Sequence, residues 1–470
     1  MPTECIPPKY RFQGSDRREV VAQFDGGKIT SDGGGLLLSE TARRTGVMRR
    51  FAKCFWDERD MRRVEHSVEE LLGQRVYGLA LGYEDLNDHD ELREDHGLAV
   101  VVGKADPTGA KRYSRHDRGK PLAGKSTLDR MELSADRRNS YQKIGVDGEA
   151  VDRFLVGTYL RSLKRKPRKI VLDVDATDDP LHGQQEGRFF HGYYKCYCYF
   201  PLYIFTDDGY PLCARLRSAN IDGSAGTVEE VSRIVGQIRE RYPKVQIVLR
   251  GDSGFAREEL MAWCEANKVQ YVFGFAQNPR VRRRIADELD EAKAQYEASG
   301  KASRVFADFQ YKTRTSWSRE RRVVAKAEHL SKGSNPRFVV TSFTAQAYGK
   351  KKLYEQVYCA RGEMENRIKE QQLCLFADRT SSSKMKTNQL RLWLSTVAYL
   401  VLHQLRNLGL KGTRLARAQC DTIRLKLLKI GAQVKISVRR IVISLASGYP
   451  YEGVFAQAYR NLLRAGPVLV

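Results

Sequence analysis

The sequence predicts a mixed α/β fold built around a five-stranded sheet. Apolar runs at 169–176, 245–250 and 270–275 have the length and composition of buried strands. A hairpin pattern, "CYFPLYIFTDDGYPLCARLRS", lies between the first two runs and turns at residues 207–209. Amphipathic helices are expected between the later strands, so the order is three meandering strands and then two helix–strand crossovers.

Local patterns justify each element of this core in chain order. "KIVLDVDA" is an alternating run that predicts the first strand. "TVEEVSRIVGQIRERY" has helical periodicity, and Thr227 with Glu230 forms a capping-box pattern at its start. "VQIVLR", "REELMAWCEANK" and "QYVFGF" predict the fourth strand, the second helix and the fifth strand. This order of elements is that of the RNase-H-like fold.

The rest of the chain divides into regions by its pattern. We expect a mainly helical N-terminal region at 1–150, a core at 165–280 and 353–410, a β-rich insertion domain at 281–352 and a basic C-terminal region at 411–470. Inside the insertion, one helical segment precedes three strand-like segments that carry many basic side chains. A polar stretch at 103–125 predicts an exposed loop in the N-terminal region.

Charge narrows the class of partner. The chain of 470 residues carries 81 lysines and arginines against 57 acids, a formal net charge of +24. Such an excess favours a partner with dense negative charge, nucleic acid first and an anionic membrane surface second. The excess is concentrated from Arg379 to Val470, where 16 basic residues face only Asp421 and Glu452. We expect this segment to contact phosphates, with an ordinary solvated basic face as the alternative.

Other patterns exclude several classes of protein. The longest apolar stretch, 392–405, is too short to span a membrane and contains His403 and Gln404, so it predicts a buried helix. The nine cysteines are scattered, and the close pair Cys196 and Cys198 lacks the second pair or the histidines of a zinc site. The basic segments lack a strongly apolar opposite face. We therefore expect a cytoplasmic protein with reduced thiols and no membrane partner.

Two aspartates fall where an open sheet places a site. Asp175 lies near the end of the first strand, on the same face as Asp173. Asp252 directly follows the fourth strand, between Gly251 and Gly254, which would let another backbone approach closely. Because open α/β sheets build their sites at the carboxyl ends of strands, we expect Asp175 and Asp252 to lie near each other.

A third acid, Glu365, lies on a predicted helix after the insertion. Carboxylates that converge on one point repel one another unless divalent cations lie between them. Two Mg²⁺ ions, roughly 3.5–4 Å apart, would stabilise the attacking and the leaving oxygens of a displacement at phosphorus. The sequence therefore predicts metal-dependent phosphodiester chemistry, with Asp175, Asp252 and Glu365 as catalytic residues and metal ligands.

Each acidic residue also has a purely structural interpretation. Asp178 and Asp179 are expected to be turn residues, and Asp173 could pair within the fold. Asp252 could cap the helix that follows it, and Glu365 could belong to an ordinary surface stripe of ion pairs. The joint placement of one acid after each of two strands and one on a later helix favours the catalytic interpretation.

The order Asp175, Asp252, Glu365 resembles that of the DDE transposases of bacterial insertion sequences. "YCARGEME" matches the Tyr-x2-Arg-x3-Glu signature of one large group of them, which also carries a β-rich insertion between the second and third acids. "LDVDATDDPLHGQQEG", "RGDSGF", "RGEMENRIKEQQL" and "LGYEDLNDHDELR" are similar to the insertion-sequence family numbered thirteen-eighty. The resemblance covers most of the chain.

This resemblance implies a transposase. It implies Mg²⁺-dependent hydrolysis at the ends of a mobile element, with Mn²⁺ able to substitute, and then attack of the freed 3′-hydroxyl on target DNA. The expected partners are the terminal inverted repeats of its own element and the target DNA, with a homodimer in the DNA complex. The expected location is the bacterial cytoplasm, on the nucleoid. On grounds of location, residues 30–100 are the expected reader of DNA sequence.

Four further residues are expected to support the chemistry. Arg361 would orient the glutamate or contact phosphate, and Tyr358 would pack beside a strand. The group signature ends with a lysine seven residues after the glutamate, but position 372 is glutamine, so Lys369 is the nearest substitute for a DNA contact. Trp317, in the basic insertion, is a candidate for stacking on an unpaired base.

Two other functions remain open on the sequence. One is an RNase-H-fold DNA endonuclease that cuts without strand transfer, because strand transfer needs no additional catalytic residue. The other is a DNA-binding protein without catalytic activity, an alternative that the glutamine at position 372 keeps open.

Overall fold

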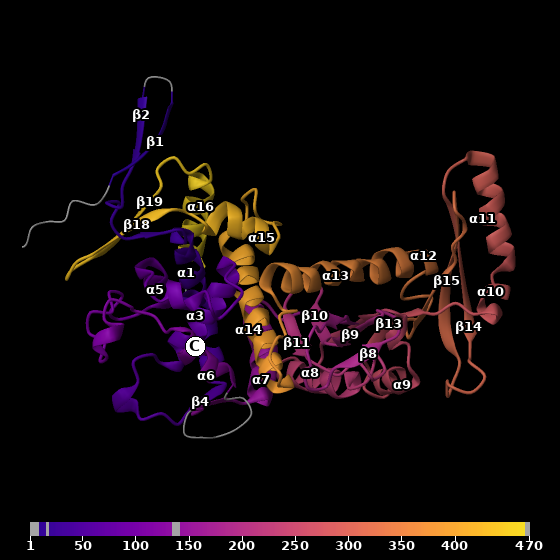
Figure 1. Ribbon diagram of the computed structural model, residues 1–470. Coiled ribbons are helices and arrows are strands. Elements are labelled where there is room, and N and C mark those ends of the chain that lie inside the picture. The colour runs from indigo at the N-terminus through magenta and orange to yellow at the C-terminus, as the bar shows by residue number, and fades with distance from the viewer. Residues whose placement is uncertain (1–8, 16–17, 134–141, 466–470) are drawn as a thin grey trace, which may run out of the picture. The chain divides into compact units, whose positions relative to one another are not determined.

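The computed structural model describes residues 9–15, 18–133 and 142–465, which fall into two compact units. The central unit is Asp147–Thr396, and the terminal unit combines Met1–Val146 with Val397–Val470. Figure 1 shows both units as ribbons. The expectation of a mixed α/β protein is confirmed, and the structure has a large mixed sheet and many helices.

The central unit contains most of the strands. Up to the fifth core strand its elements are α7 (Gly148–Ser162), β6 (Lys169–Ala176), β7 (Asp179–Pro180), β8 (Phe189–His191), β9 (Cys196–Tyr199), β10 (Leu202–Thr206), β11 (Pro211–Arg215), α8 (Thr227–Arg241), β12 (Gln246–Gly251), η4 (Ser253–Phe255), α9 (Glu258–Ala266) and β13 (Gln270–Phe275). After it come α10 (Pro279–Arg283), α11 (Ala286–Ser299), β14 (Ser303–Tyr311), β15 (Arg321–Leu330), β16 (Gly333–Ser334), β17 (Arg337–Thr341), α12 (Lys350–Lys352), η5 (Leu353–Tyr358), η6 (Cys359–Arg361), α13 (Gly362–Lys369) and η7 (Glu370–Cys374). Helix α14 (Met385–Gln404) runs on into the terminal unit.

The terminal unit is mainly helical. Its N-terminal part contains β1 (Tyr10–Ser15), β2 (Arg18–Ala22), β3 (Ile29–Thr30), η1 (Gly33–Gly35), α1 (Leu36–Thr45), α2 (Val47–Ala52), β4 (Phe55–Asp57), η2 (Met61–Arg63), α3 (Val68–Leu81), α4 (His89–Leu92), α5 (His96–Val102), η3 (Arg115–Asp117), α6 (Lys125–Leu133) and β5 (Ile144–Val146). Its C-terminal part contains η8 (Leu405–Gly409), α15 (Cys420–Ile423), η9 (Arg424–Leu428), β18 (Ala432–Ile436), β19 (Ile441–Leu445) and α16 (Glu452–Arg464).

One sheet of nine strands organises the central unit. Its order is β11-β10-β6-β12-β13-β17-β15-β14, with β16 paired to β15. β11, β10 and β6 are antiparallel neighbours, whereas β6, β12 and β13 run parallel, so the carboxyl ends of these three strands meet at one edge. The strands within residues 281–352, where an insertion domain was expected, continue this sheet, because β17 pairs antiparallel with β13. The predicted strands at 169–176 and 270–275 are found with those bounds.

Helices cover both faces of this sheet, as Figure 1 shows: α12 and α13 run along one side of the strands, and α8 and α9 lie on the other. On the α13 side, an apolar cluster joins the strands to the π-helix η5. Its members are Val171, Val248, Val272, Phe306, Val324, Val339, Phe343, Leu353 and Tyr354. This packing fixes the start of the helical run that carries the predicted Glu365 and orients it over β6, β12 and β13.

One predicted helix cap is wrong. Thr227 is the first residue of α8 rather than its cap, and the N-cap is Gly226, which has a φ of 73°. Glu230 does not turn back to the helix start, because its carboxylate binds Arg215 and Arg233 instead. A capping box forms at α3, where Ser67 and Glu70 exchange hydrogen bonds. Charged partners on neighbouring elements thus compete with a local capping pattern.

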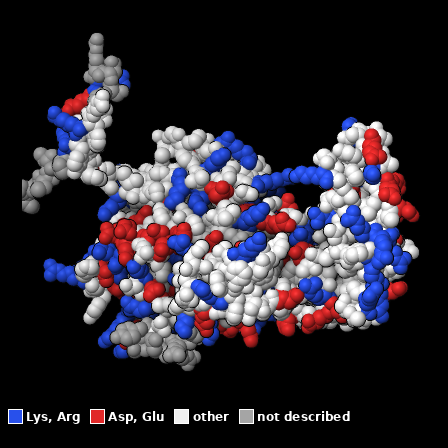
Figure 2. All heavy atoms as spheres, turned by 45° about the vertical axis from the view of Figure 1, so that its right-hand side comes forward, with Lys and Arg blue, Asp and Glu red and all other residues white. Residues whose placement is uncertain are grey.

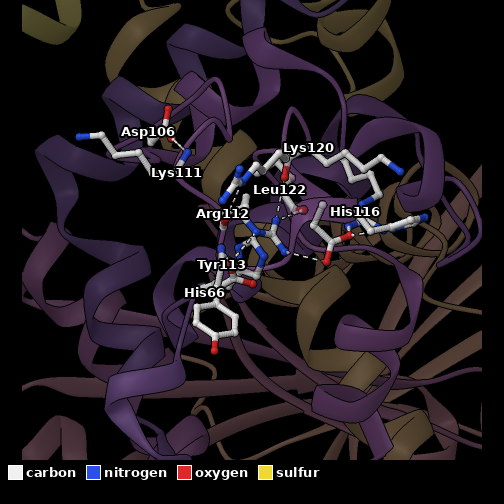
Figure 3. Close-up of polar contacts among 12 residues, drawn as sticks. His66, Asp106, Lys111, Arg112, Tyr113, His116, Lys120 and Leu122 are labelled. Atoms are coloured by element: carbon white, nitrogen blue, oxygen red, sulfur yellow. Dashed lines mark hydrogen bonds and ion pairs between the residues drawn. The ribbon is translucent and has the colours of Figure 1, made fainter.

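The predicted loop at 103–125 is held in place by Arg112. Its guanidinium donates to the carbonyls of Lys120 and Leu122 at 2.7 and 3.2 Å and pairs with Glu65 at 3.0 Å. Figure 3 shows Arg112 at the centre of these contacts, with Tyr113 directed away from them. The Tyr113 side chain is exposed. Arg112 is therefore one of several contacts that order the loop, together with the ion pair between Arg93 and Asp117.

Across the described ranges, no helix has both the length and the apolar character needed to cross a membrane. All eight cysteines within those ranges are free thiols, and five of them are buried. The close pair Cys196 and Cys198 lies on β9 without a disulfide.

Candidate active site

The first strand of the core brings two aspartates to the face that η5 and α13 cover. Asp173 is buried and accepts two hydrogen bonds from Arg250 on β12, at 2.6 and 2.7 Å. The two residues are direct partners in the parallel ladder of β6 and β12. Asp175, two residues later, lies at the end of β6 and is partly accessible. Asp173 is thus a paired structural residue, whereas Asp175 faces the edge of the sheet.

Asp252 follows β12 and starts the short turn η4. Its Oδ1 accepts a hydrogen bond from the backbone N–H of Gly254 at 2.8 Å, so Asp252 caps the short turn η4, whereas the N-cap of the following helix α9 is Arg257. No hydrogen bond to Oδ2 is found within the described part of the chain. One oxygen therefore fixes the orientation of the carboxylate, and the other is available to a ligand.

Arg361 connects the third predicted residue to the first. Its guanidinium donates to Asp175 Oδ2 at 3.1 Å and to Glu365 Oε1 at 3.3 Å. Arg361 ends η6 and Glu365 lies one turn later on α13, where 52% of its side chain is exposed. The predicted signature spacing thus places Arg361 between two carboxylates that come from different elements.

The pKa of the Asp175 carboxyl reflects its burial and the charges around it. Burial raises the pKa of its carboxyl to about 7, and the nearby charges of Asp252 and Glu365 act in the same direction. The Arg361 guanidinium opposes this rise. The three carboxylates therefore share one electrostatic environment, in which a single arginine is the main positive partner of Asp175.

The Tyr358 hydroxyl approaches the end of β13 closely because residue 274 is a glycine. A Cβ at Gly274 on β13 would lie 2.7 Å from the Tyr358 hydroxyl and 2.8 Å from the backbone nitrogen of Ser253. Only glycine leaves space for this approach, because real side chains do not tolerate such contacts. Tyr358 therefore packs beside the end of β13, next to the turn that carries Asp252.

The remaining predicted residues lie in different surroundings. Lys369 is exposed on α13, and Gln372 donates to the carbonyl of Asp178 at 2.9 Å, which ties η7 to the segment after β6. Trp317 is only 4% exposed and packs against Phe275 and Tyr311. A base-stacking role for its ring would require the ring to leave this packing.

Asp178 and Asp179, expected to be turn residues, differ from each other. Asp179 is the first residue of β7 and is buried, with one oxygen accepting from Thr380 at 3.2 Å. Burial raises the pKa of the Asp179 carboxyl. Asp178 precedes this strand and is partly exposed. Asp179 is therefore a strand residue rather than a turn residue.

The donor set fits a hard divalent cation. Asp175, Asp252 and Glu365 offer carboxylate oxygens, the ligands that Mg²⁺ prefers. Within the described residues, no three acidic, cysteine or histidine side chains converge closely enough to enclose an ion as they stand. The Arg361 guanidinium lies between two of these carboxylates, those of Asp175 and Glu365.

Sequence patterns did not identify Arg250 and Gly274. Arg250 donates a third hydrogen bond, to the carbonyl of Val357 in η5 at 2.9 Å, so it links β6, β12 and the helical run that carries Glu365. The signal available in the sequence was a charged residue at the end of "VQIVLR" facing Asp173 in the adjacent parallel strand. Gly274 has no sequence signal beyond being a glycine in a strand.

Comparisons with known proteins identify the family of the chain. A family profile described as "Transposase DDE domain group 1" matches residues 12–467. Among solved structures, the piggyBac transposase in a synaptic complex with hairpin DNA is similar at 11% identity with a TM-score of 0.37, covering 84% of this chain and 80% of that one. The chain has no match among curated proteins. Because the family match spans nearly its whole length, the chain belongs to the group 1 family of DDE transposase domains.

Proposed function

We propose that this transposase cuts DNA at the ends of a mobile element and joins the freed 3′-hydroxyl to target DNA. The observation that carries the proposal is the placement of Asp175 and Asp252 at the carboxyl ends of two parallel strands, with Arg361 bridging Asp175 to Glu365. We propose these three acids as the catalytic residues on an RNase-H-like core formed by β11, β10, β6, β12 and β13. The resemblance to the thirteen-eighty family supports a bacterial insertion sequence as the element.

The three carboxylates would hold one or two Mg²⁺ ions, or Mn²⁺ in their place. When bound, such ions lower the pKa of water and stabilise charge on the attacking and leaving oxygens. In this proposal Arg361 holds Asp175 and Glu365 in place before a cation binds. It then turns toward a phosphate oxygen, a task suited to its planar fork of donors. Tyr358 and Gly274 keep the turn that carries Asp252 at a fixed position.

Basic surfaces on both units would hold the phosphodiester backbone. On the insertion, exposed arginines gather on α10 and on the loop that follows β14, where Arg280 lies over the Tyr311 ring. Figure 2 shows basic side chains gathered on this part of the molecule. On the terminal unit, Lys435, Arg439 and Arg440 are exposed on the hairpin of β18 and β19. Both groups support DNA as the partner, through phosphate contacts that carry no sequence information.

The further parts of the proposal follow from the reaction. Two element ends must be joined to one target, so we propose a homodimer in the complex with the terminal inverted repeats and target DNA. We propose that residues 1–150 contain the region that recognises DNA sequence. We also propose residues 165–280 and 353–410 as the core, 281–352 as the insertion domain and 411–470 as the basic C-terminal region. The proposed location is the bacterial nucleoid. Lys369 is exposed and stays a candidate for a DNA contact.

The test compares two glutamates of the same helix. Glu365→Gln removes the proposed ligand. Glu363→Gln is a matched control because Glu363 is exposed and, among the described residues, forms an ion pair only with Arg367, at 3.8 Å. The substrate is a labelled duplex carrying the DNA that flanks the gene, with Mg²⁺ and a target plasmid. We expect Glu365→Gln to lower cleavage about a hundredfold or more, while Glu363→Gln stays near wild type and both bind the duplex equally.

Product analysis separates the alternatives. Cleavage at one position with joined products from wild type supports transposition. Cleavage without joining would favour the endonuclease that lacks strand transfer. Equal binding by all three proteins with no cleavage in Mg²⁺ or Mn²⁺ would favour a DNA-binding protein without activity, and equal cleavage by both variants would remove Glu365 from the site.

A further inference from the structure

An aromatic hairpin interrupts the core between its first and second strands. β8 and β9 pair antiparallel, with Phe190 opposite Tyr197, and β9 also pairs with β7. We call residues 188–197 the aromatic hairpin. Its turn is closed by a hydrogen bond from the Lys195 N–H to the His191 carbonyl at 2.8 Å, and Lys195 has a φ of 56°. The turn therefore has a defined conformation rather than that of a loose loop.

Aromatic side chains of the hairpin are unusually exposed. The exposed fractions are 83% for Tyr193, 56% for Phe190, 46% for Tyr197 and 42% for Phe189. Clustered apolar surface of this kind in a soluble protein indicates a binding site for a partner. The hairpin itself contains no acidic residue, because none lies between Gly187 and Thr206, and the nearest in the chain is Glu186.

The exposed rings of the hairpin are held in place by packing on other aromatic rings. Tyr194 and His191 pack on Phe200 with ring centroids 6.0 and 4.9 Å apart, and Phe200 belongs to a buried cluster. Tyr193 stands edge-on to Tyr194 at 5.0 Å. On the strands, Phe190 meets Tyr197 at 5.6 Å, and the Arg188 guanidinium lies 4.2 Å from the centre of the Tyr197 ring. Binding of a flat ligand here would cost little conformational entropy, because the aromatic rings are already held in position.

The aromatic hairpin lies beside the candidate active site. Tyr194 and Ala176, the residue directly after Asp175, both pack against the buried cluster that contains Phe200. Burial raises the pKa of the Tyr194 hydroxyl, and the charges of Asp178, Asp175 and Asp252 contribute in the same direction. The hairpin therefore lies near Asp175 and Asp252 in the central unit.

We infer that the aromatic hairpin stacks an unpaired nucleobase of the DNA strand held at the active site, with Arg188 and Lys195 meeting its phosphates. This inference rests on the proposed function. A nucleobase offers a flat face that stacks on aromatic rings without regard to sequence, and arginine and lysine supply the charge that its phosphates require. A strand bent into a site at the edge of a sheet has its bases unstacked beside the cleavage point, where Tyr193 and Phe190 would replace the lost stacking.

The test measures base stacking without cleavage. 2-Aminopurine, whose fluorescence falls on stacking, is placed in a short single-stranded overhang or inside a blunt duplex, and binding is followed in EDTA. The variants are Tyr193→Ala and Phe190→Ala, with Tyr193→Trp as a rescue. Tyr113→Ala is the control, because Tyr113 is 94% exposed on the terminal unit and lies outside the hairpin. Both target rings are exposed, so the variants should keep the wild-type fold, as melting curves will check.

We expect wild type and Tyr113→Ala to quench the overhang probe. Tyr193→Ala and Phe190→Ala should lose the quenching and bind the overhang DNA about tenfold more weakly, while their affinity for blunt duplex changes less than about twofold. Tyr193→Trp should restore the quenching, because any large aromatic ring can stack.

Other outcomes overturn the inference in distinguishable ways. If both alanine variants quench and bind like wild type, the stacking inference is wrong and the proposed function stands. If they change the oligomeric state measured by light scattering and leave quenching intact, the hairpin is a contact between copies of the chain. If wild type binds neither DNA, the proposed function fails, and the inference fails with it.

Discussion

At the scale of single residues, the ion pair of Arg250 and Asp173 stands out because it is buried. Removing one partner of such a pair leaves an uncompensated charge, which costs about 3–5 kcal/mol of stability. Arg250 is more than a stabilising residue, since it also donates to the Val357 carbonyl in η5. We interpret it as a positioning residue that sets where the helical run bearing Arg361 and Glu365 begins.

The substitution Arg250→Lys separates the ion pair of Arg250 with Asp173 from its positioning of the helical run through Val357. A lysine can pair with Asp173 but cannot also reach the Val357 carbonyl with a planar fork of donors. We expect the cleavage rate at saturating DNA to fall about tenfold with DNA affinity unchanged. Arg321→Lys is the matched control, because Arg321 is buried and bidentate in the same sheet but binds Glu258 and Glu265.

The control variant should lower the melting temperature without lowering the cleavage rate. If Arg250→Lys loses stability and retains the wild-type rate, Arg250 has no positioning task.

At the scale of elements, α3 and α4 of the terminal unit enclose a neutral histidine. His89 is fully buried, and its two ring nitrogens lie 3.0 Å from Gln74 Nε2 and 3.1 Å from Arg75 Nη1. Burial lowers the pKa of His89 to about 3, and the Arg75 charge acts in the same direction. Burial and the charge of Lys104 lower the pKa of His66 similarly, to about 3.

This arrangement predicts acid sensitivity of the terminal unit. The folded pKa values lie below the ordinary 6.5, so the unfolded chain binds protons that the folded chain does not. Stability is fully present above about pH 6.5 and is lost as the pH falls toward 3. At pH 5 each histidine costs about 2 kcal/mol.

Urea unfolding of wild type and His89→Gln at pH 7.5 and pH 5 measures this effect. The stability lost between the two pH values should be about 2 kcal/mol smaller in the variant. The comparison of differences cancels any uniform cost of the substitution. Equal losses in the two proteins would show that His89 is protonated in the folded state.

Local patterns predicted elements better than contacts between them. The strands at 169–176 and 270–275 could be recognised because each is a mainly apolar run whose consecutive residues are buried, and the helix at 286–299 because it is rich in strong helix formers. The cap of α8 was wrong because Glu230 bonds to arginines on and beyond its own helix. β8 and β9 were not separated from the following hairpin, since one aromatic-rich run contains both strand signals and exposed rings.

The candidate site shows the same limit. Asp175, Asp252 and Glu365 could be selected from the sequence because each follows or lies on a recognisable element. The bridging by Arg361 joins residues 186 apart in the chain, and the bond from Arg250 to Val357 joins residues 107 apart. No periodicity within one element encodes contacts at such separations, so they required the structure.

At the scale of the whole molecule, the net charge of +24 predicts steeply salt-dependent DNA binding. If about six to ten phosphates are neutralised, affinity should fall by about 10³–10⁵ between 50 and 200 mM salt. Replacing Arg282 and Arg283 on α10 by alanine should lower the slope of log affinity against log salt by about two.

Lys293→Ala is the control for this prediction, because Lys293 is exposed on the acid-rich helix α11 and lies near Glu297. Filter binding at four salt concentrations measures the slopes. Identical slopes for wild type and the α10 double variant would exclude α10 from the DNA-contacting surface.

The continuous sheet has a further consequence for how this protein can be altered. β13 pairs with β12 on one side and with β17 on the other, so it is an interior strand. Excising the insertion would leave β13 with a row of unpaired backbone donors and acceptors, which invites pairing with a second chain. The strands of the insertion therefore keep β13 from being an exposed edge strand. A shortened version of this enzyme would be prone to aggregate through the edge of β13.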